Sequence, residues 1–174
     1  MTPVREALRR LAAEGALLPQ GNRRVTVPRV SLALLDQIAF ARLTIEPHLA
    51  ELAAAHLTPA LIARLEALDA QVDAAIRAGD ITAYLQSNHA FHFALYEASN
   101  APVLVDMARS LWLRFGPSLR IVVARGGALA LPDQHGLALS AMREGDGAGL
   151  ARALRDDILQ GVDQVRTALA RGEV

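Results

Sequence analysis

From residue 31 onward, capping and helix-breaking residues divide the sequence into helix-forming segments, and this pattern limits the chain to an all-α architecture. Ser31 is placed to cap a long helix that runs to about residue 56, and Thr58-Pro59 begins the next helix, which ends near Gly79. Further helices are expected over residues 81–99, 103–125, 132–145 and 147–171. A break of the 103–125 segment around Gly116-Pro117 is left open. The pattern predicts an antiparallel bundle of six or seven helices with short connections.

The composition supports helix and excludes several classes of protein. Ala, Leu and Arg dominate, and these side chains lose little rotamer freedom in a helix. Apolar stretches are interrupted by charge before the about 18 residues that a membrane span needs, and no signal-peptide pattern follows Met1. A cytoplasmic protein without membrane contact is therefore expected. The absence of cysteine restricts any metal ligands to histidine, carboxylate, amide or water.

The segment from Thr2 to about Gly15 is predicted to form a short amphipathic helix. Thr2 can cap it, and Pro3 fits the first helical position, where its missing N–H costs nothing. Val4, Leu8 and Leu11 share one face at helical spacing, which leaves the arginines of this segment on the exposed side. The segment thus offers a basic surface and an apolar face.

A short hairpin is expected next, over residues 16–28, with a turn at Gly21-Asn22 and β-branched residues after it. A helix followed by a hairpin with a basic tip is the second half of a winged helix. Residues 1–31 hold six arginines against two acids, whereas the rest holds twelve arginines against sixteen acids. We therefore divide the chain into a DNA-facing domain at residues 1–30 and a helical domain at residues 31–174.

Two motifs carry a resemblance to a known family. The run from Thr2 to Leu11, Thr-Pro-Val-Arg-Glu-Ala-Leu-Arg-Arg-Leu, with Glu14-Gly15 after it, resembles the recognition-helix signature of GntR transcription regulators. The run from Phe91 to Asn100, Phe-His-x-x-Leu-Tyr-x-Ala-Ser-Asn, is similar to a stretch of the FCD ligand domain that follows the wing in FadR-like members. Both occur in the expected order, and the resemblance covers essentially the whole chain.

The resemblance implies a segment before Met1. The family's winged domain begins with two further helices, which cover the face that Val4, Leu8 and Leu11 present here. We therefore expect Met1 to be an internal start, with about 40–60 further residues before it, the usual length of two helices and their turns.

The resemblance and the charge pattern together give the expected DNA contacts. Near the N-terminus of the recognition helix, Thr2 and Arg5 are placed to reach the major groove, and Arg9 is the next basic position on that face. Arg23 and Arg24 at the wing would contact the DNA backbone. The alternative is that these are merely solvated arginines.

Many family members hold a divalent metal in the ligand domain, and matching their ligand positions to this sequence gives Asn88, His92, His135 and Asp157. Asn88 and His92 share a helical face at a spacing of four residues. An amide stands in the first position and Asp157 where histidine is commoner, and Asp156 is the alternative if the last helix is rotated. Two imidazoles and a carboxylate suit zinc, nickel or manganese.

For His92 and His135 the alternative is a side chain that binds no metal and is either hydrogen-bonded within the protein or exposed to solvent. His48, His56 and His89 match no family role and are expected at the surface or in local hydrogen bonds. Arg42 occupies a place where the family often carries an inward-facing arginine, so it is the candidate for binding the carboxylate of an effector. Its alternative is an internal ion pair with Glu46, four residues later.

These features predict a homodimeric, ligand-responsive transcription regulator that binds operator DNA and senses a small organic acid, through a divalent metal where one is bound. The first alternative is a sensing or scaffold protein without DNA binding. The second is a metal-dependent enzyme, but the sequence has no nucleophile motif, phosphate loop or separate general base. We therefore expect no enzymatic activity.

Overall fold

The computed structural model describes residues 3–21, 24–123 and 132–172. Its elements are α1 (Pro3–Ala13), β1 (Leu18–Gln20), β2 (Arg24–Thr26), α2 (Leu32–Ala54), α3 (Pro59–Ala78), α4 (Ile81–Glu97), α5 (Pro102–Val123), α6 (Gln134–Glu144) and α7 (Gly147–Ala170). The all-α prediction is confirmed, since helices dominate these ranges and the sheet has two strands. We call residues 3–28, with α1 and the hairpin, the head, and α2 to α7 the helical body.

The helix starts lie where the capping residues predict them. The Ser31 hydroxyl accepts a hydrogen bond from the Leu34 backbone N–H at 3.2 Å, and the Thr58 hydroxyl accepts one from Leu61 at 3.1 Å. Helix α5 continues through Pro117, so the break left open at this position does not occur. Proline removes one backbone donor there, and burial of Phe115 and Leu119 on either side holds the helix together.

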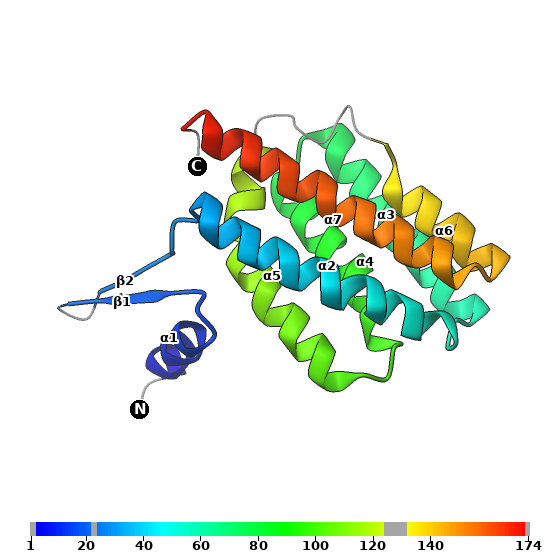
Figure 1. The fold of residues 1–174 in the computed structure, drawn as a ribbon, viewed down its shortest axis with the longest axis horizontal. Helices are drawn as coiled ribbons and strands as arrows, with labels where there is room; N and C mark the ends of the chain where they lie inside the picture. Colours follow the sequence, from blue (N-terminus) through cyan, green and yellow to red (C-terminus); the bar gives the residue numbers. More distant parts are fainter. Residues whose placement is uncertain (1–2, 22–23, 124–131, 173–174) are drawn as a thin grey trace.

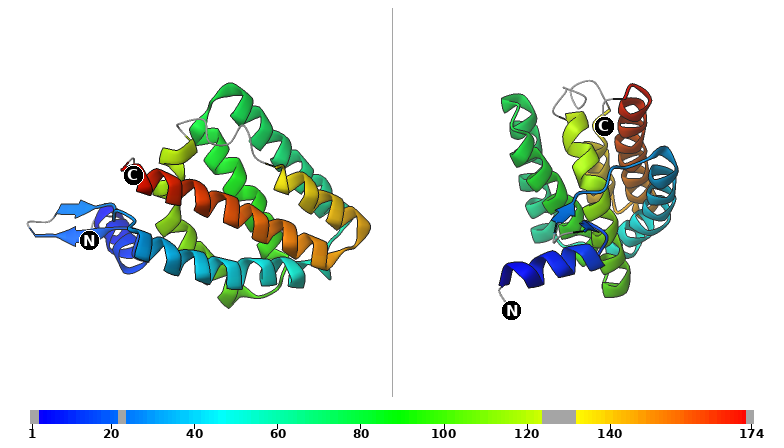
Figure 2. Two further views of the ribbon diagram at one scale, coloured as in Figure 1. Left: turned by 45° about the horizontal axis from the view of Figure 1, so that its top comes forward. Right: turned by 90° about the vertical axis from the view of Figure 1, so that its left-hand side faces the viewer.

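The six helices of the body form a bundle in which neighbours in space are not always neighbours in sequence. In the side views of Figure 2, α2 and α7 lie together on one side and α3 and α4 on the other, with α5 between them. Helix α6 packs against α7 and α3. Residues from α3, α4, α6 and α7 therefore meet inside the bundle.

Two groups of buried apolar side chains form the core. The larger group joins all six helices of the body, α2 to α7, and includes Leu49, Phe91 and Leu154. The smaller group, nearer the head, joins α2, α5 and α7 around Leu35 and Phe115. Burial of side chains of this size contributes about 1.5–3 kcal/mol each, so this interior is the main source of stability.

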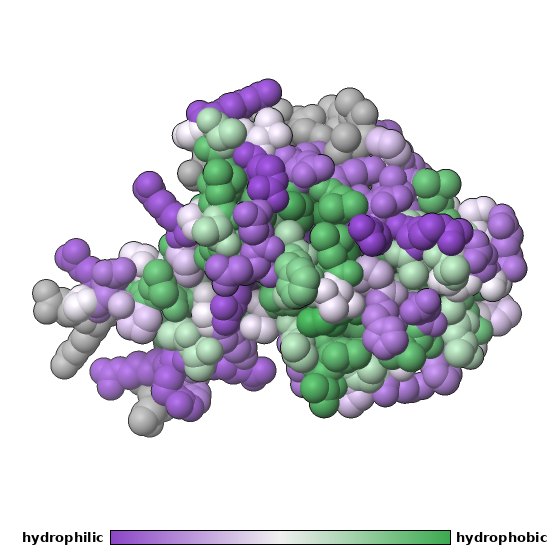
Figure 3. All heavy atoms as spheres, in the orientation of Figure 1, coloured by the Kyte–Doolittle hydropathy of each residue, from purple (hydrophilic) through white to green (hydrophobic). Residues whose placement is uncertain are grey.

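The head projects from one end of the helical body (Figure 1). Its strands pair antiparallel, with Pro19 opposite Val25, as the predicted hairpin requires. Helix α1 contains no buried residue, and Val4 is 68% exposed. In Figure 3 hydrophilic side chains cover much of the head, whereas apolar ones gather over parts of the body.

The head is attached to α5 at the end of α1. The Arg114 guanidinium donates to the Glu14 carbonyl at 3.2 Å, and the Ser110 hydroxyl lies 3.5 Å from the same oxygen. Gly15 adopts a φ of 75°, and a Cβ there would lie 2.6 Å from Arg114. Glycine at this position therefore satisfies both the backbone conformation and the close contact.

A transmembrane helix is not found in the described ranges, because none of their helices is both long and apolar enough to cross a bilayer.

Candidate metal and effector site

A stripe of polar side chains runs along the inner face of α4. Tyr84, Asn88, His92 and Tyr96 follow one another at intervals of four residues, which places them on one side of the helix. Asp80 fixes the start of this helix by accepting a hydrogen bond from the Ala83 backbone N–H at 3.0 Å. Asn88, His92 and Tyr96 are buried, so the stripe faces the bundle interior.

Side chains from α6 and α7 meet His92 in this interior. The His135 Nε2 atom lies 3.3 Å from His92 Nε2, and the Asp157 carboxylate lies 3.3 Å from His92 Nε2 and 4.0 Å from His135 Nε2. Their ligand atoms all lie within 4.8 Å of one another. We call His92, His135 and Asp157 the three-residue cluster. Asp156 is exposed, so the alternative rotation of α7 does not occur.

Hydrogen bonds on the far side of each ring fix both imidazoles. The Tyr96 hydroxyl donates to Glu46 at 2.7 Å, so its oxygen accepts from His92 Nδ1–H at 3.0 Å. The Asp69 carboxylate on α3 accepts from His135 Nδ1–H at 3.0 Å. Both Nε2 lone pairs are therefore directed toward each other, the arrangement found when an outer carboxylate or hydroxyl orients a metal-binding histidine.

The separation of the two Nε2 atoms fits a bound cation. Two lone pairs at 3.3 Å repel each other unless a proton or a metal ion lies between them. Zinc–nitrogen bonds of about 2.0–2.1 Å in tetrahedral geometry put two nitrogens about 3.3 Å apart. The side chains present thus match the donor types and the spacing of a borderline divalent ion.

The protonation states of His92 and Asp157 suit a cation, whereas a proton on His135 competes with one. Burial lowers the pKa of His92 and outweighs the nearby Asp157, so this imidazole is neutral. Burial would raise the pKa of Asp157, but its hydrogen bond and charge interactions with His92 and His135 lower it to about 2. Burial opposes protonation of His135, but Asp69 and Asp157 outweigh it and raise the pKa of His135.

A second buried network lies beside the cluster and centres on Glu46. Its carboxylate accepts hydrogen bonds from Arg42 Nε at 2.5 Å, from the Tyr96 hydroxyl and from Trp112 Nε1 at 3.0 Å. The Arg42 guanidinium lies 4.7 Å from the ring centroids of both Trp112 and Phe115. The internal ion pair that sequence left as the alternative for Arg42 is therefore formed.

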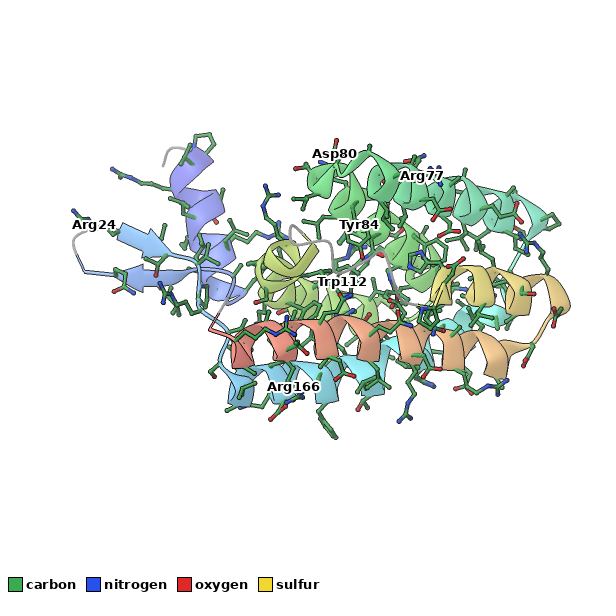
Figure 4. The ribbon with its side chains drawn as sticks, turned by 90° about the horizontal axis from the view of Figure 1, so that it is seen from above. Arg24, Arg77, Asp80, Tyr84, Trp112 and Arg166 are labelled. Atoms are coloured by element: carbon green, nitrogen blue, oxygen red, sulfur yellow. The ribbon has the colours of Figure 1, made fainter. Side chains whose placement is uncertain are left out.

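The cluster opens into a cavity of about 250 Å³. Its wall includes Arg42, Tyr84, Asn88, His135 and Asp157. Within the ranges that the structure describes, the Asn88 amide and the Tyr84 hydroxyl have no hydrogen-bond partner. Burial and Asp157 raise the pKa of Tyr84 to about 12, which keeps this hydroxyl a donor. Figure 4 shows Tyr84 and Trp112 inside the bundle, between α3 and α7.

The structure thus places Asn88, His135 and Asp157 in the wall of one cavity, and His92 contacts the last two of these residues. Sequence reasoning did not find Asp69 or Trp112. A signal for Asp69 existed, because Leu65 and Val72 bracket it at helical spacing on the buried face of α3. The position of Trp112 depends on how α5 packs, which no local pattern shows.

The DNA-contact candidates lie on the surface of the head as far as they are described. Arg5, Arg9 and Arg24 are exposed, and Arg9 forms an ion pair with Glu6 at 2.6 Å. Figure 4 shows Arg24 on the hairpin, away from the helical body. Thr2 and Arg23 lie outside the described residues.

The remaining histidines are exposed, as expected from the sequence. His48 lies 3.5 Å from Glu51, and the His89 ring stacks on Phe93. Neither takes part in the cluster.

Comparison with known proteins identifies the family. The FCD domain matches residues 37–160. The HTH-type transcriptional regulator McbR of Escherichia coli (strain K12) is 33% identical over 165 residues, which make up 93% of this chain and 75% of that protein. The chain belongs to the GntR-family regulators with an FCD domain. The relatives named here are transcription regulators and not enzymes, in agreement with the expectation from sequence.

Solved structures agree with this assignment. The structure of E. coli McbR/YncC matches with a TM-score of 0.80 and 29% identity, over 94% of this chain and 83% of that one. A putative GntR regulator from Rhodococcus sp. RHA1 matches with a TM-score of 0.74 and 21% identity, over 95% of this chain and 79% of that one. The second match supports the fold alone.

Proposed function

We propose that this transcription regulator senses a small organic acid through a divalent metal held by the three-residue cluster. The observation that carries the proposal is the pair of Nε2 atoms 3.3 Å apart, each imidazole fixed from behind by Tyr96 or Asp69. Zinc, nickel and manganese are the candidate ions. When bound, such an ion supplies Lewis-acid sites for the oxygens of an effector.

The wall of the cavity supports a carboxylate as the effector. Asn88 and Tyr84 offer donors that no described residue uses, and Arg42 adds a positive charge to the same wall. Arg42 is already paired with Glu46, and four aspartates line the same cavity. A bound divalent ion would therefore supply the positive charge that an anionic effector needs. A volume of about 250 Å³ limits the effector to a small molecule.

The head supports operator binding. We propose residues 1–30 as the DNA-binding part and 31–174 as the effector-binding part, with Thr2, Arg5, Arg9, Arg23 and Arg24 at the DNA. Two heads in a homodimer would span a palindromic operator. Exposed apolar side chains on α2 and α5, among them Phe40, Val103 and Met107, supply surface for such a dimer.

Fluorescence anisotropy of the full-length protein, with the segment expected before Met1, tests this function on promoter DNA. We expect sequence-specific binding that weakens steeply with salt, and a loss of about tenfold or more in Arg5→Ala. Arg64→Ala, which removes an exposed arginine of α3, is the matched control and should bind normally. Zinc with citrate as the probe effector should change the affinity by about fivefold or more. A protein that binds no DNA under any of these conditions would be the sensing protein without DNA binding.

The hydrogen bond from His135 to Asp69 gives a separate prediction. Asp69→Ala should lower zinc affinity about 10–100-fold, because the imidazole loses the carboxylate that orients it. Asp163→Ala is the control, since Asp163 is exposed on α7 and does not line the cavity. Isothermal titration calorimetry measures both. Equal zinc affinities in the two variants would show that Asp69 does not contribute to metal binding.

A further inference from the structure

A second cavity, of about 850 Å³, lies where the head meets the helical body. It is lined by Arg10 of α1, by Glu14 just after α1, by Leu85 and His89 of α4, and by residues of α5 between Asp106 and Arg120. We call it the junction cavity. It is separate from the three-residue cluster, none of whose members lines it.

The charged side chains of the junction cavity are partly paired. Arg10 pairs with Glu14 at 2.8 Å, and Arg109 pairs with Glu97 at 2.7 Å and also lies 3.8 Å from Asp106, a second acid of the wall. Arg120 lines the same cavity and forms no ion pair with any residue in the described part of the chain. An anion near Arg120 would thus gain a charge-assisted contact without breaking an existing pair.

The rest of the wall is mostly apolar. Leu85, Leu113 and Pro117 line it, together with one side of Trp112. Trp112 and Leu119 also line the first cavity, so they form the partition between the two. An apolar wall beside an arginine that has no ion-pair partner among the described residues is complementary to a molecule with an apolar body and one acidic end.

We propose that the junction cavity is a second effector site, which binds a small amphipathic carboxylate. The carboxylate pairs with Arg120, and the apolar part packs against Leu85, Leu113 and Pro117. Such a ligand contacts α1 of the head and, through Trp112, the wall of the first cavity. If a ligand in the junction cavity changes the affinity of the first cavity for its effector, the effector changes the affinity of the junction cavity for that ligand by the same factor.

Fluorescence of Trp112, the single tryptophan of the chain, reports occupancy directly. We expect 4-phenylbutyrate to change this fluorescence saturably and the uncharged 4-phenylbutan-1-ol to bind about tenfold more weakly. Arg120→Gln should weaken phenylbutyrate binding by a similar factor, while Arg64→Gln on α3 should leave it unchanged. Equal binding of acid and alcohol, or no effect of Arg120→Gln, would overturn the proposal.

Gly116→Leu tests the location. A Cβ at Gly116 meets no atom within 4 Å, so the new side chain enters open space at the cavity wall, and leucine favours helix over glycine. Phenylbutyrate binding should be lost in this variant, while its helical circular dichroism is kept. His92→Ala should retain binding. Loss in His92→Ala with binding kept in Gly116→Leu would place the ligand in the first cavity and overturn the proposal, as would no binding at all.

Discussion

Glu46→Ala is expected to destabilise the protein by about 3–5 kcal/mol, because it leaves the Arg42 guanidinium buried without its counterion. Tyr96 and Trp112 lose the same acceptor. For a chain of this size the loss lowers the melting temperature by roughly 10 °C or more. Differential scanning calorimetry and urea unfolding measure it.

Glu51→Ala is the control, since Glu51 lies on the same helix with its side chain 58% exposed. Its effect should stay within about 0.5 kcal/mol. The double variant Arg42→Met with Glu46→Leu should recover much of the lost stability, because it removes both charges and keeps the volume. Equal stability of Glu46→Ala and Glu51→Ala would show that the ion pair contributes nothing to the folded state.

The helix starts were predictable from the sequence because each depends on a capping side chain within a few residues of it. Ser31 and Thr58 each cap backbone N–H groups within three residues, so the start of each helix is determined by a few neighbouring side chains. The continuous α5 was harder, since Gly116-Pro117 weakens a helix locally and burial of Phe115 and Leu119 offsets this only in the folded bundle.

The site was predictable to the extent that the resemblance carried it. Asn88 and His92 share a face by spacing alone, but the meeting of His92 with His135 and Asp157 depends on the packing of α4, α6 and α7. The choice between Asp156 and Asp157 depends on the rotation of α7, which the buried Leu154 and Ile158 fix in the bundle. Asp69 was missed because it acts from a helix to which no motif pointed.

The metal prediction has the largest expected effect on binding. His92→Ala should reduce zinc affinity by more than about a hundredfold, since it removes a ligand, and loss of an outer-shell partner alone costs about 10–100-fold. With free zinc about a thousandfold above the dissociation constant, the unmodified protein should gain about 4 kcal/mol of stability, and the variant little. Isothermal titration calorimetry and thermal unfolding, each with and without zinc, measure the two quantities.

His92 is fully buried beside Tyr96 and Trp112, so its removal also alters packing. Each variant is therefore compared with its own metal-free form, which separates the stabilisation by zinc from the cost of the cavity. His56→Ala, at an exposed position after α2, should keep the full stabilisation. If zinc stabilised His92→Ala and His56→Ala equally, the ion would bind elsewhere. The two facing Nε2 atoms would then be joined by a hydrogen bond that a protonated His135 donates to His92, and the raised pKa of His135 favours that form.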